Sequence, residues 1–222
     1  HGLLDLVNRP QWYVVQGGSD QYVNVIRNRL QDLRLGCPVR AVTREKTRVW
    51  VTAGATVEAF DEVVFACHSG QALALLTDAS KAERDVLGAM GYSGNEVVLH
   101  QDASVMPVRP EVWASWNYHA PLGATQASLT YYMNRLQGFA STQPVLVTLN
   151  DAGTIDENLV LKRVHYEHPV FDAAMLAAQG RHAEISGVGR THYCGAYWRY
   201  GFHEDGVVSG LRVVDALVAN GA

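Results

Sequence analysis

The chain has 222 residues, of which 48% are apolar and 18% are charged, so it is long enough for one large globular domain or two small ones. Its formal net charge is −4 and its basic residues are scattered, which argues against a nucleic-acid-binding surface. No apolar run of about 18 residues is present that could span a bilayer, and no signal peptide is visible at the start.

The first patterned segment is a strand-like run over residues 12–15, followed by a turn at Gly17 and Gly18. Ser19 or Asp20 then caps a helix that we expect to continue until Leu35-Gly36. Residues 39–42 and 48–52 are predicted to form two strands joined by a charged turn. Residues 61–66 form a third, almost wholly apolar strand, which is typical of a strand covered on both faces.

Three cysteines, Cys37, Cys67 and Cys194, lie far apart in apolar segments. An odd number at this spacing favours reduced core thiols over a disulfide framework. We therefore expect a cytoplasmic protein, with peripheral attachment to the inner membrane as the alternative.

The middle of the chain, residues 78–190, has a different pattern. A helix capped by Ser80 is predicted over residues 81–90, and strand-like runs follow at 95–102, 113–119, 127–135, 143–150 and 160–166. These runs alternate apolar and polar residues, which indicates a half-buried antiparallel sheet with one face presented to a ligand or partner. A helix over residues 169–182 closes this part.

The tail begins with a strand-like run over residues 191–198 and continues as a helix. Its apolar residues recur at helical spacing at Val207, Leu211, Val214, Leu217 and Val218. Glu204 and Asp205 fall in the first helical turn, where carboxylates complement unpaired N–H groups. Small residues at Gly206, Ser209 and Gly210 leave this end open to a flat or phosphorylated ligand. The alternative is a C-terminal helix that simply packs on a sheet after a glycine-rich turn.

The tail, together with the Gly17-Gly18 turn and the strand over residues 61–66, resembles flavin-dependent amine oxidases and carotenoid-type desaturases. His68-Ser69-Gly70, Val98-Leu99-His100-Gln101-Asp102, residues 113–118 and Gly201-Phe202-His203-Glu204-Asp205-Gly206 are most similar to the bacterial predicted amine oxidoreductases. This resemblance implies an α+β fold in which residues 1–77 and 191–222 belong to an FAD-binding domain. Residues 78–190 would then form the substrate domain.

The resemblance also implies the functional residues. The cofactor-binding residues would be Gly17, Gly18, Val39, Gly195, Ala196, Phe202, His203, Glu204, Asp205, Gly206 and Val207. Aromatic residues that could line a substrate cavity are Trp116, Tyr118, Tyr131, Tyr132 and Trp198, although a place in the core or on a sheet face is the more common one for such residues. The implied chemistry is hydride removal by FAD from an amine or an acyl lipid.

The sequence departs from the family pattern in three ways. No G-x-G-x-x-G turn, which seats a dinucleotide pyrophosphate, occurs anywhere in it. Ala196 stands where relatives carry an acidic residue, and Asp205 brings a negative charge to the helix start, where it could tune a flavin or cap the helix. We therefore expect this chain to be an inactive part of a roughly twofold larger flavoprotein whose N-terminal nucleotide-binding lobe is missing.

Other classes of function have weaker support in the sequence. His165, Glu167, His168 and His203 are residue types found in metal sites, but their spacing lacks a metal-binding motif, and we predict no metal. No G-x-S-x-G motif is present for a hydrolase. The alternative from another class is a non-enzymatic binding module that forms a homodimer through the exposed sheet face.

Overall fold

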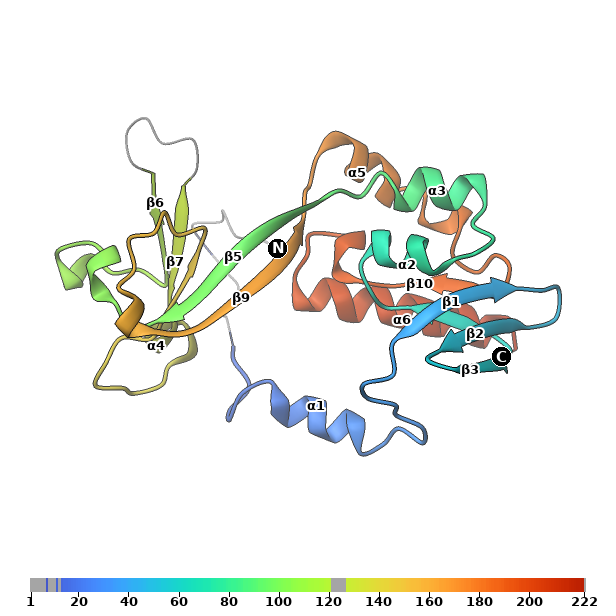
Figure 1. The fold of residues 1–222 in the computed structure, drawn as a ribbon, viewed down its shortest axis with the longest axis horizontal. Helices are drawn as coiled ribbons and strands as arrows, with labels where there is room; N and C mark the ends of the chain where they lie inside the picture. The colour runs from blue at the N-terminus through green and yellow to red at the C-terminus, as the bar shows by residue number, and fades with distance from the viewer. Residues whose placement is uncertain (1–6, 8–10, 12, 121–126, 222) are drawn as a thin grey trace. The chain divides into compact units, whose positions relative to one another are not determined.

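The computed structural model contains both helices and strands and describes residues 7, 11, 13–120 and 127–221 (Figure 1). The helices are α1 (Asp20–Arg27), α2 (Ser69–Leu75), α3 (Lys81–Leu87), α4 (Met133–Gln137), α5 (Ala173–Gln179) and α6 (His203–Ala219). The strands are β1 (Val39–Arg44), β2 (Val49–Ala53), β3 (Thr56–Phe60), β4 (Val63–Phe65), β5 (Tyr92–His100), β6 (Trp116–His119), β7 (Ser128–Tyr132), β8 (Leu146–Leu149), β9 (Val160–Pro169) and β10 (Thr191–Tyr193). The α+β class predicted from the sequence is confirmed.

The chain divides into two compact units. The first comprises residues 1–36, 99–148 and 152–161, and the second comprises residues 37–98, 149–151 and 162–222. The sheet with strand order β6-β7-β8-β5-β9 includes β5 and β9, whose residues are divided between the two units. The division into an FAD-binding and a substrate domain at residues 77 and 191 stays a prediction.

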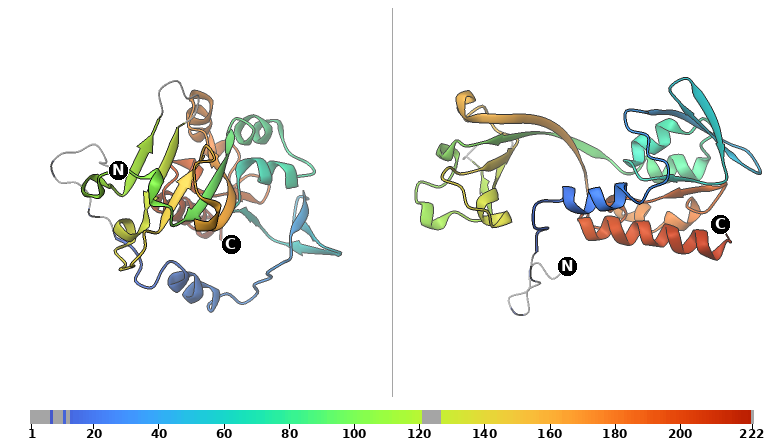
Figure 2. Two further views of the ribbon diagram at one scale, coloured as in Figure 1. Left: turned by 60° about the vertical axis from the view of Figure 1, so that its left-hand side comes forward. Right: turned by 90° about the horizontal axis from the view of Figure 1, so that it is seen from below.

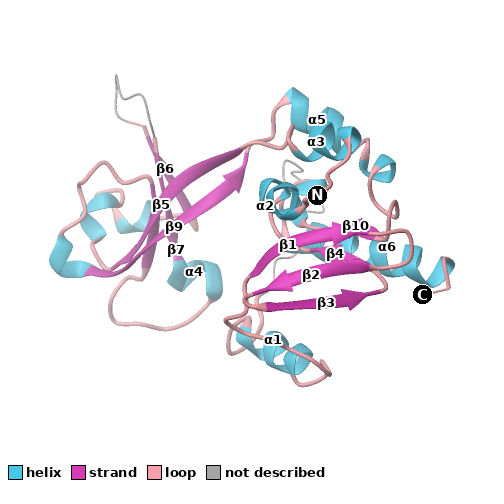
Figure 3. Ribbon diagram, turned by 45° about the vertical axis from the view of Figure 1, so that its right-hand side comes forward, coloured by secondary structure: helices cyan, strands magenta, loops and turns pink. Residues whose placement is uncertain are grey.

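The second unit is built on two small sheets (Figure 3). Strands β1, β2 and β3 form an antiparallel meander, whereas β4 and β10 pair in parallel. The parallel register sets Val63 opposite Thr191 and Phe65 opposite Tyr193. The Phe65 and Tyr193 rings stack at a centroid distance of 5.5 Å. A segment from the first third of the chain is thus the immediate neighbour of one near its end.

Helices α2, α3 and α5 pack with strands β1 and β2 in the apolar core of the second unit. Its buried members include Val42, Val49, Leu87, Met175 and Ile185. The start of α3 is fixed by Ser80, whose Oγ accepts a hydrogen bond from the Glu83 N–H, while the Glu83 carboxylate accepts one from the Ser80 N–H. This reciprocal capping box confirms the predicted helix start.

Glu83 is a deeply buried charge of the second unit, and it joins three distant segments. Its carboxylate accepts two hydrogen bonds from the guanidinium of Arg44 on β1, one at 2.9 Å from Nη2 and one from Nη1. The Tyr193 hydroxyl on β10 donates a third at 2.6 Å. Glu83 is 3% exposed and Tyr193 is fully buried. A buried carboxylate with this set of donors is stable only while all its partners stay in place.

These contacts decide the protonation of the network. Burial alone would raise the pKa of Glu83, but the hydrogen bonds from Arg44, Tyr193 and Ser80 outweigh it and lower this pKa to about 2. Burial and the Glu83 charge raise the pKa of Tyr193, so the tyrosine remains a donor. Arg44 is held further by Asp78, whose Oδ1 lies 3.1 Å from Nε.

The first unit has a buried polar chain of its own. His100 Nε2 lies 2.8 Å from Thr148 Oγ1, which lies 2.8 Å from Thr130 Oγ1. His100 Nδ1 accepts a hydrogen bond from the Asp102 N–H, so a neutral ring carries its proton on Nε2 and donates it to Thr148. The buried polar side chains of these strands are therefore hydrogen-bonded to one another.

Several predicted boundaries near the N-terminus are wrong. Within the predicted strand over residues 12–15, residue 12 lies outside the described residues, and residues 13–15 are not a strand. Tyr13 is 86% exposed, and no described strand pairs with this segment to satisfy its backbone groups. Helix α1 ends at Arg27 instead of at Leu35-Gly36. It buries none of its residues, so no packing stabilises a longer helix.

Other segments differ in length or type. Strand β4 is shorter than predicted. Phe65 lies in the apolar core, whereas Val64, which points to the other face, is 42% exposed, so the described residues do not bury both faces of this strand. Strand β3 and helix α2 were not predicted. Helix α5 begins after Asp172, whose side chain accepts a hydrogen bond from the Met175 N–H, while Pro169 ends β9. The predicted strand over residues 191–198 ends at Tyr193, and a short 3₁₀ turn follows.

Helix α6 runs toward the C-terminus (Figure 2). It lies where the sequence predicted a helix, but its apolar side is not the buried one. Its apolar residues Val207, Leu211, Val214 and Val218 are more than half exposed. The buried residues are Asp205, Ser209 and Val213, which recur every four positions. The small and polar side of α6 packs against the tail, because Ser209 and Asp205 both hydrogen-bond to backbone N–H groups there.

We expect Glu83→Gln to lower the free energy of unfolding at pH 7 by about 3 kcal/mol, because Arg44 would lose its buried carboxylate partner and keep only the more exposed Asp78. Urea denaturation measures this difference. The control is Asp85→Asn on the same helix, which removes an exposed pair with Lys81 and should change stability little. Equal effects of the two substitutions would contradict the assigned role of Glu83.

The stability difference between the wild-type protein and Glu83→Gln should depend on pH. The pKa of Glu83 falls from an ordinary 4.5 to about 2 on folding, so its stabilisation is complete above pH 4.5 and is lost as the pH falls toward 2. The stability difference between wild type and Glu83→Gln should therefore narrow across this window. Denaturation curves at several pH values that show a constant difference would contradict the low pKa.

Candidate functional site

The tail after β10 turns sharply at Gly195. The Cys194 N–H donates a hydrogen bond to the Phe65 carbonyl, and the Gly195 N–H donates one to Ser209 Oγ on α6 at 3.1 Å. A Cβ at Gly195 would lie 2.4 Å from the Tyr197 ring, so any side chain there would clash. Glycine is required for this turn because the backbone passes directly against an aromatic ring.

The start of α6 is capped by Asp205. Its Oδ2 accepts a hydrogen bond from the Phe202 N–H at 3.0 Å, and its Oδ1 lies 3.7 Å from Arg199 Nε. Asp205 is 1% exposed, whereas Phe202, His203 and Glu204 are exposed. The sequence left two roles open for Asp205, tuning a flavin or capping the helix, and the structure shows the capping contact.

The first turns of α6 are lined by small residues. A Cβ built at Gly206 would meet Ala196 at an ordinary 3.9 Å, and one at Gly210 would meet nothing within 4 Å. Val207 on the same turn is exposed. The predicted cofactor residues from 195 to 207 therefore form one continuous turn and helix start, with space beside its backbone.

The other predicted cofactor residues lie elsewhere in the chain. Gly17 and Gly18 adopt positive φ angles of 81° and 91° in the turn before α1, in the first unit. Val39 begins β1 in the second unit and is 38% exposed. Glycine accommodates the positive φ angles of this turn, and valine is common in strands. That these three residues contact the cofactor stays a prediction.

The predicted cavity aromatics fall into two groups. Trp116 and Tyr118 lie on β6, where Trp116 is the cross-strand partner of Tyr131 on β7. Tyr132 follows directly and faces the other side of the strand, where its ring meets Trp113 edge-on at 5.3 Å. Burial raises the pKa of Tyr131. These residues belong to the first unit and do not form a single surface.

Trp198 lies in the second unit and is 4% exposed. Its ring packs edge-on against His182 at 4.5 Å, and His182 Nε2 donates a hydrogen bond to the Tyr193 carbonyl at 2.8 Å. Burial lowers the pKa of His182 and raises that of Tyr197. Trp198 is thus a packed aromatic of the tail.

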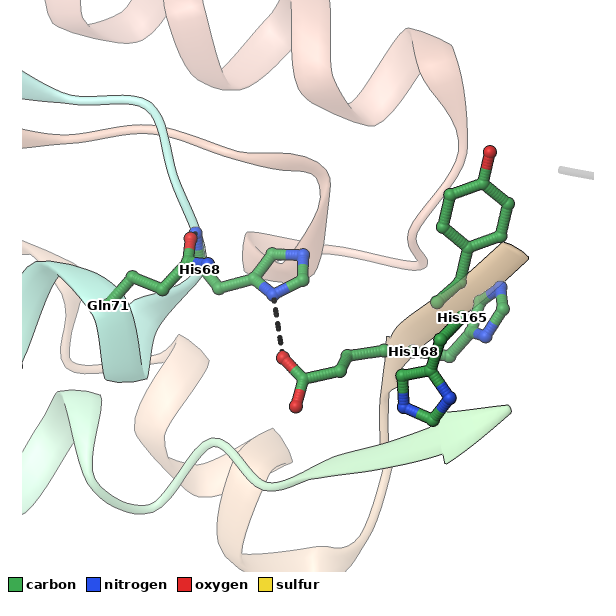
Figure 4. A pocket seen from close by; sticks show the side chains of 6 residues that line it. His68, Gln71, His165 and His168 are labelled. Carbon is green, nitrogen blue, oxygen red and sulfur yellow. Dashed lines mark hydrogen bonds and ion pairs between the residues drawn. The ribbon is translucent and has the colours of Figure 1, made fainter. Parts of the chain in front are cut away.

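A pocket of about 480 Å³ in the second unit was not predicted as a site (Figure 4). It is lined by His68, Gln71, His165, Tyr166, Glu167 and His168. Figure 4 shows His68 and Gln71 on one side and His165 and His168 on the other. His68 Nδ1 lies 3.7 Å from Glu167 Oε2. Three of the six lining residues are histidines, and the sequence could have drawn attention to them. The contact between His68 and Glu167 could not be predicted, because only the folded chain brings residues 68 and 167 together.

The described residues include no cluster of metal-ligating side chains, and their cysteines are free. No group of three or more His, Cys, Asp and Glu side chains among the described residues could hold a metal ion. Cys37, Cys67 and Cys194 are free thiols, and burial raises the pKa of Cys67 and Cys194. Within residues 7, 11, 13–120 and 127–221, no helix has the length and apolarity to cross a membrane.

Comparison with known proteins identifies the family. Residues 4–218 match the model of the flavin-containing amine oxidoreductases, so the chain belongs to this family. FAD is the cofactor of the family, which confirms the predicted cofactor type. No curated protein sequence gives a significant match.

Solved structures show the same fold at low sequence identity. A fatty acid isomerase from P. acnes that produces CLA is 13% identical, with a TM-score of 0.59 over 91% of this chain and 52% of that one. A putative protoporphyrinogen oxidase from Exiguobacterium sp. 255-15 is 13% identical, with a TM-score of 0.61 over 91% and 51%. Putrescine oxidase bound to putrescine is 15% identical, with a TM-score of 0.61 over 91% and 53%. The chain spans about half the length of each.

We expect Gly195→Ala to destabilise the protein by more than 1 kcal/mol, roughly the scale of overpacking, because the added methyl would collide with the Tyr197 ring. The matched control is Gly210→Ala, which adds the same methyl to an open site on α6 and should stabilise the helix by up to about 1 kcal/mol. Thermal denaturation compares the two. Equal changes in melting temperature would contradict the close packing at Gly195.

Proposed function

We propose that the whole protein is an FAD-dependent oxidoreductase that removes hydride from a small-molecule amine. The observation that carries this proposal is the parallel pair β4 and β10, which leads through the Gly195 turn into α6. That segment presents small residues at Ala196, Gly206 and Gly210, so a flat ring system can approach its backbone.

When bound, the flavin supplies the acceptor for the hydride. The residues of this chain have a supporting role. Asp205 and Ser209 fix the start of α6 through their hydrogen bonds to Phe202 and Gly195. Tyr197 and Trp198 pack beneath the turn and keep water away from its inner side. In this proposal the predicted residues from Gly195 to Val207 contact the cofactor ring, and Gly17, Gly18 and Val39 contact its other parts.

We propose further that the 222-residue chain is inactive by itself. Its sequence contains no G-x-G-x-x-G turn, and the solved structures that resemble it are about twice as long. A separate nucleotide-binding part would supply the contacts to the pyrophosphate. The amine is favoured over an acyl lipid because putrescine oxidase is among the similar structures, although a fatty acid isomerase is as well.

A second candidate function is a binding module that dimerises through the sheet of the first unit. The observation that favours it is the exposure of two aromatic residues on β6, Trp116 at 48% and Tyr118 at 74%. Exposed aromatic side chains on one strand are common at protein interfaces. This candidate predicts a dimer that Trp116→Ser and Tyr118→Ser disrupt, which sedimentation of the purified chain can detect.

Flavin content of the full-length protein tests the enzymatic proposal. Purified protein should be yellow, and Gly206→Leu should weaken FAD binding roughly tenfold because the added side chain fills the space beside α6. The control is Gly91→Leu, at an exposed position with nothing within 4 Å of a Cβ. Colourless protein that cannot take up added FAD would contradict the proposal, as would equal flavin content in the two variants.

A further inference from the structure

The pocket of the second unit has one acidic side chain among neutral hydrogen-bonding groups. Its six lining residues include the carboxylate of Glu167, three imidazoles, an amide and a phenol, and none is Lys or Arg. A concave site with this lining attracts positive charge and offers acceptor atoms around it.

His68 is held in place from two sides. Its ring stacks on Tyr92 at a centroid distance of 4.4 Å and an interplanar angle of 18°. Its backbone N–H donates to Gln71 Oε1 at 3.1 Å, and the next N–H, of Ser69, donates to the Tyr92 hydroxyl. The imidazole therefore has a defined orientation at the N-terminal end of α2, with Nδ1 directed at Glu167 (Figure 4).

The opposite wall, on β9, is also built by specific contacts. His168 Nδ1 accepts a hydrogen bond from Asn95 Nδ2 at 3.0 Å, and Asn95 Oδ1 accepts one from Asn150 at 2.9 Å. Gly94 leaves room for His165, because a Cβ there would lie 2.8 Å from His165 Nε2. Residues on β5 thus set the positions of two of the pocket histidines.

The distance between His68 Nδ1 and Glu167 Oε2 allows one ligand group to donate hydrogen bonds to both atoms. At 3.7 Å, Nδ1 and Oε2 are too far apart for a direct hydrogen bond. A ligand group with several N–H donors and a positive charge can donate to both atoms at once. A carboxylate or phosphate would be repelled by Glu167 and would find no Lys or Arg in the lining.

We propose that this pocket binds the protonated nitrogen of a primary amine, with Glu167 balancing its charge and His68 Nδ1 accepting a hydrogen bond. The inference rests on the proposed function in that it gives the amine substrate a named site. It adds a residue set that lies outside the glycine turn at the start of α6 and outside the aromatic residues of β6 and β7.

Binding of small probes to the purified chain tests this directly. Butylamine should shift the imidazole NMR signals of His68 and His165, whereas butanol and butyrate should shift them far less. Glu167→Gln should weaken butylamine binding about fivefold, as expected for a half-exposed charge pair. The control is Glu45→Gln, which removes an equal charge at an exposed turn of the same unit and should leave the affinity unchanged.

Stronger binding of butyrate than of butylamine, or equal effects of the two glutamate substitutions, would overturn the inference. A second variant, His68→Phe, keeps a ring against Tyr92 but removes the acceptor, and should also weaken binding. Two results separate this inference from the proposed enzymatic function. If butylamine binds in the pocket but the full-length protein holds no flavin, the amine site is supported and the oxidase function is not. If the full-length protein is a flavin oxidase whose activity is unaffected by Glu167→Gln, the oxidase function is supported and the amine site is not.

Discussion

The buried carboxylate of Glu83 is the interaction on which the second unit depends. Strand β1, helix α3 and strand β10 each supply one member of the network, at positions 44, 83 and 193. Because a buried charge without partners is strongly unfavourable, the three segments are held together as a set. Arg190 reinforces this, since its guanidinium donates hydrogen bonds to the carbonyls of Lys46 and Asp61. The tail reaches its place beside β4 through these contacts, and the Gly195 turn and α6 follow from that placement.

Much of the fold could be predicted because local chemistry and tertiary structure agree. Ser80 followed by Glu83 is a capping pattern that marks the start of α3, and alternation of apolar residues marks β5 to β9. The family was predicted from the tail around Gly195 and Gly206, together with the Gly17-Gly18 turn and the strand over residues 61–66. At Gly195 the Tyr197 ring lies so close to the backbone that only glycine fits. Glycines of this kind leave a signal that does not depend on knowing what packs against them.

The remaining features could not be predicted because they depend on distant partners. Apolar spacing in α6 indicated a core face at Val207, Leu211 and Val214, yet hydrogen bonds to Asp205 and Ser209 turn the other side inward. The pocket combines residue 68 with residues 165–168, and no local pattern links them. The same is true of Arg44 and Glu83, each of which looks like an ordinary surface charge in the sequence. Long-range polar contacts thus decide which face is buried and where a ligand pocket opens.

Hydrogen exchange in Glu83→Gln tests most directly whether one buried carboxylate positions the tail. If it does, amides of β10 and of the turn at residues 194–198 lose protection in this variant, while amides of β6 and β7, which contain no member of the network, keep theirs. Unchanged protection of β10 in a variant that has lost the Arg44 and Tyr193 contacts would show that Glu83 does not position the tail.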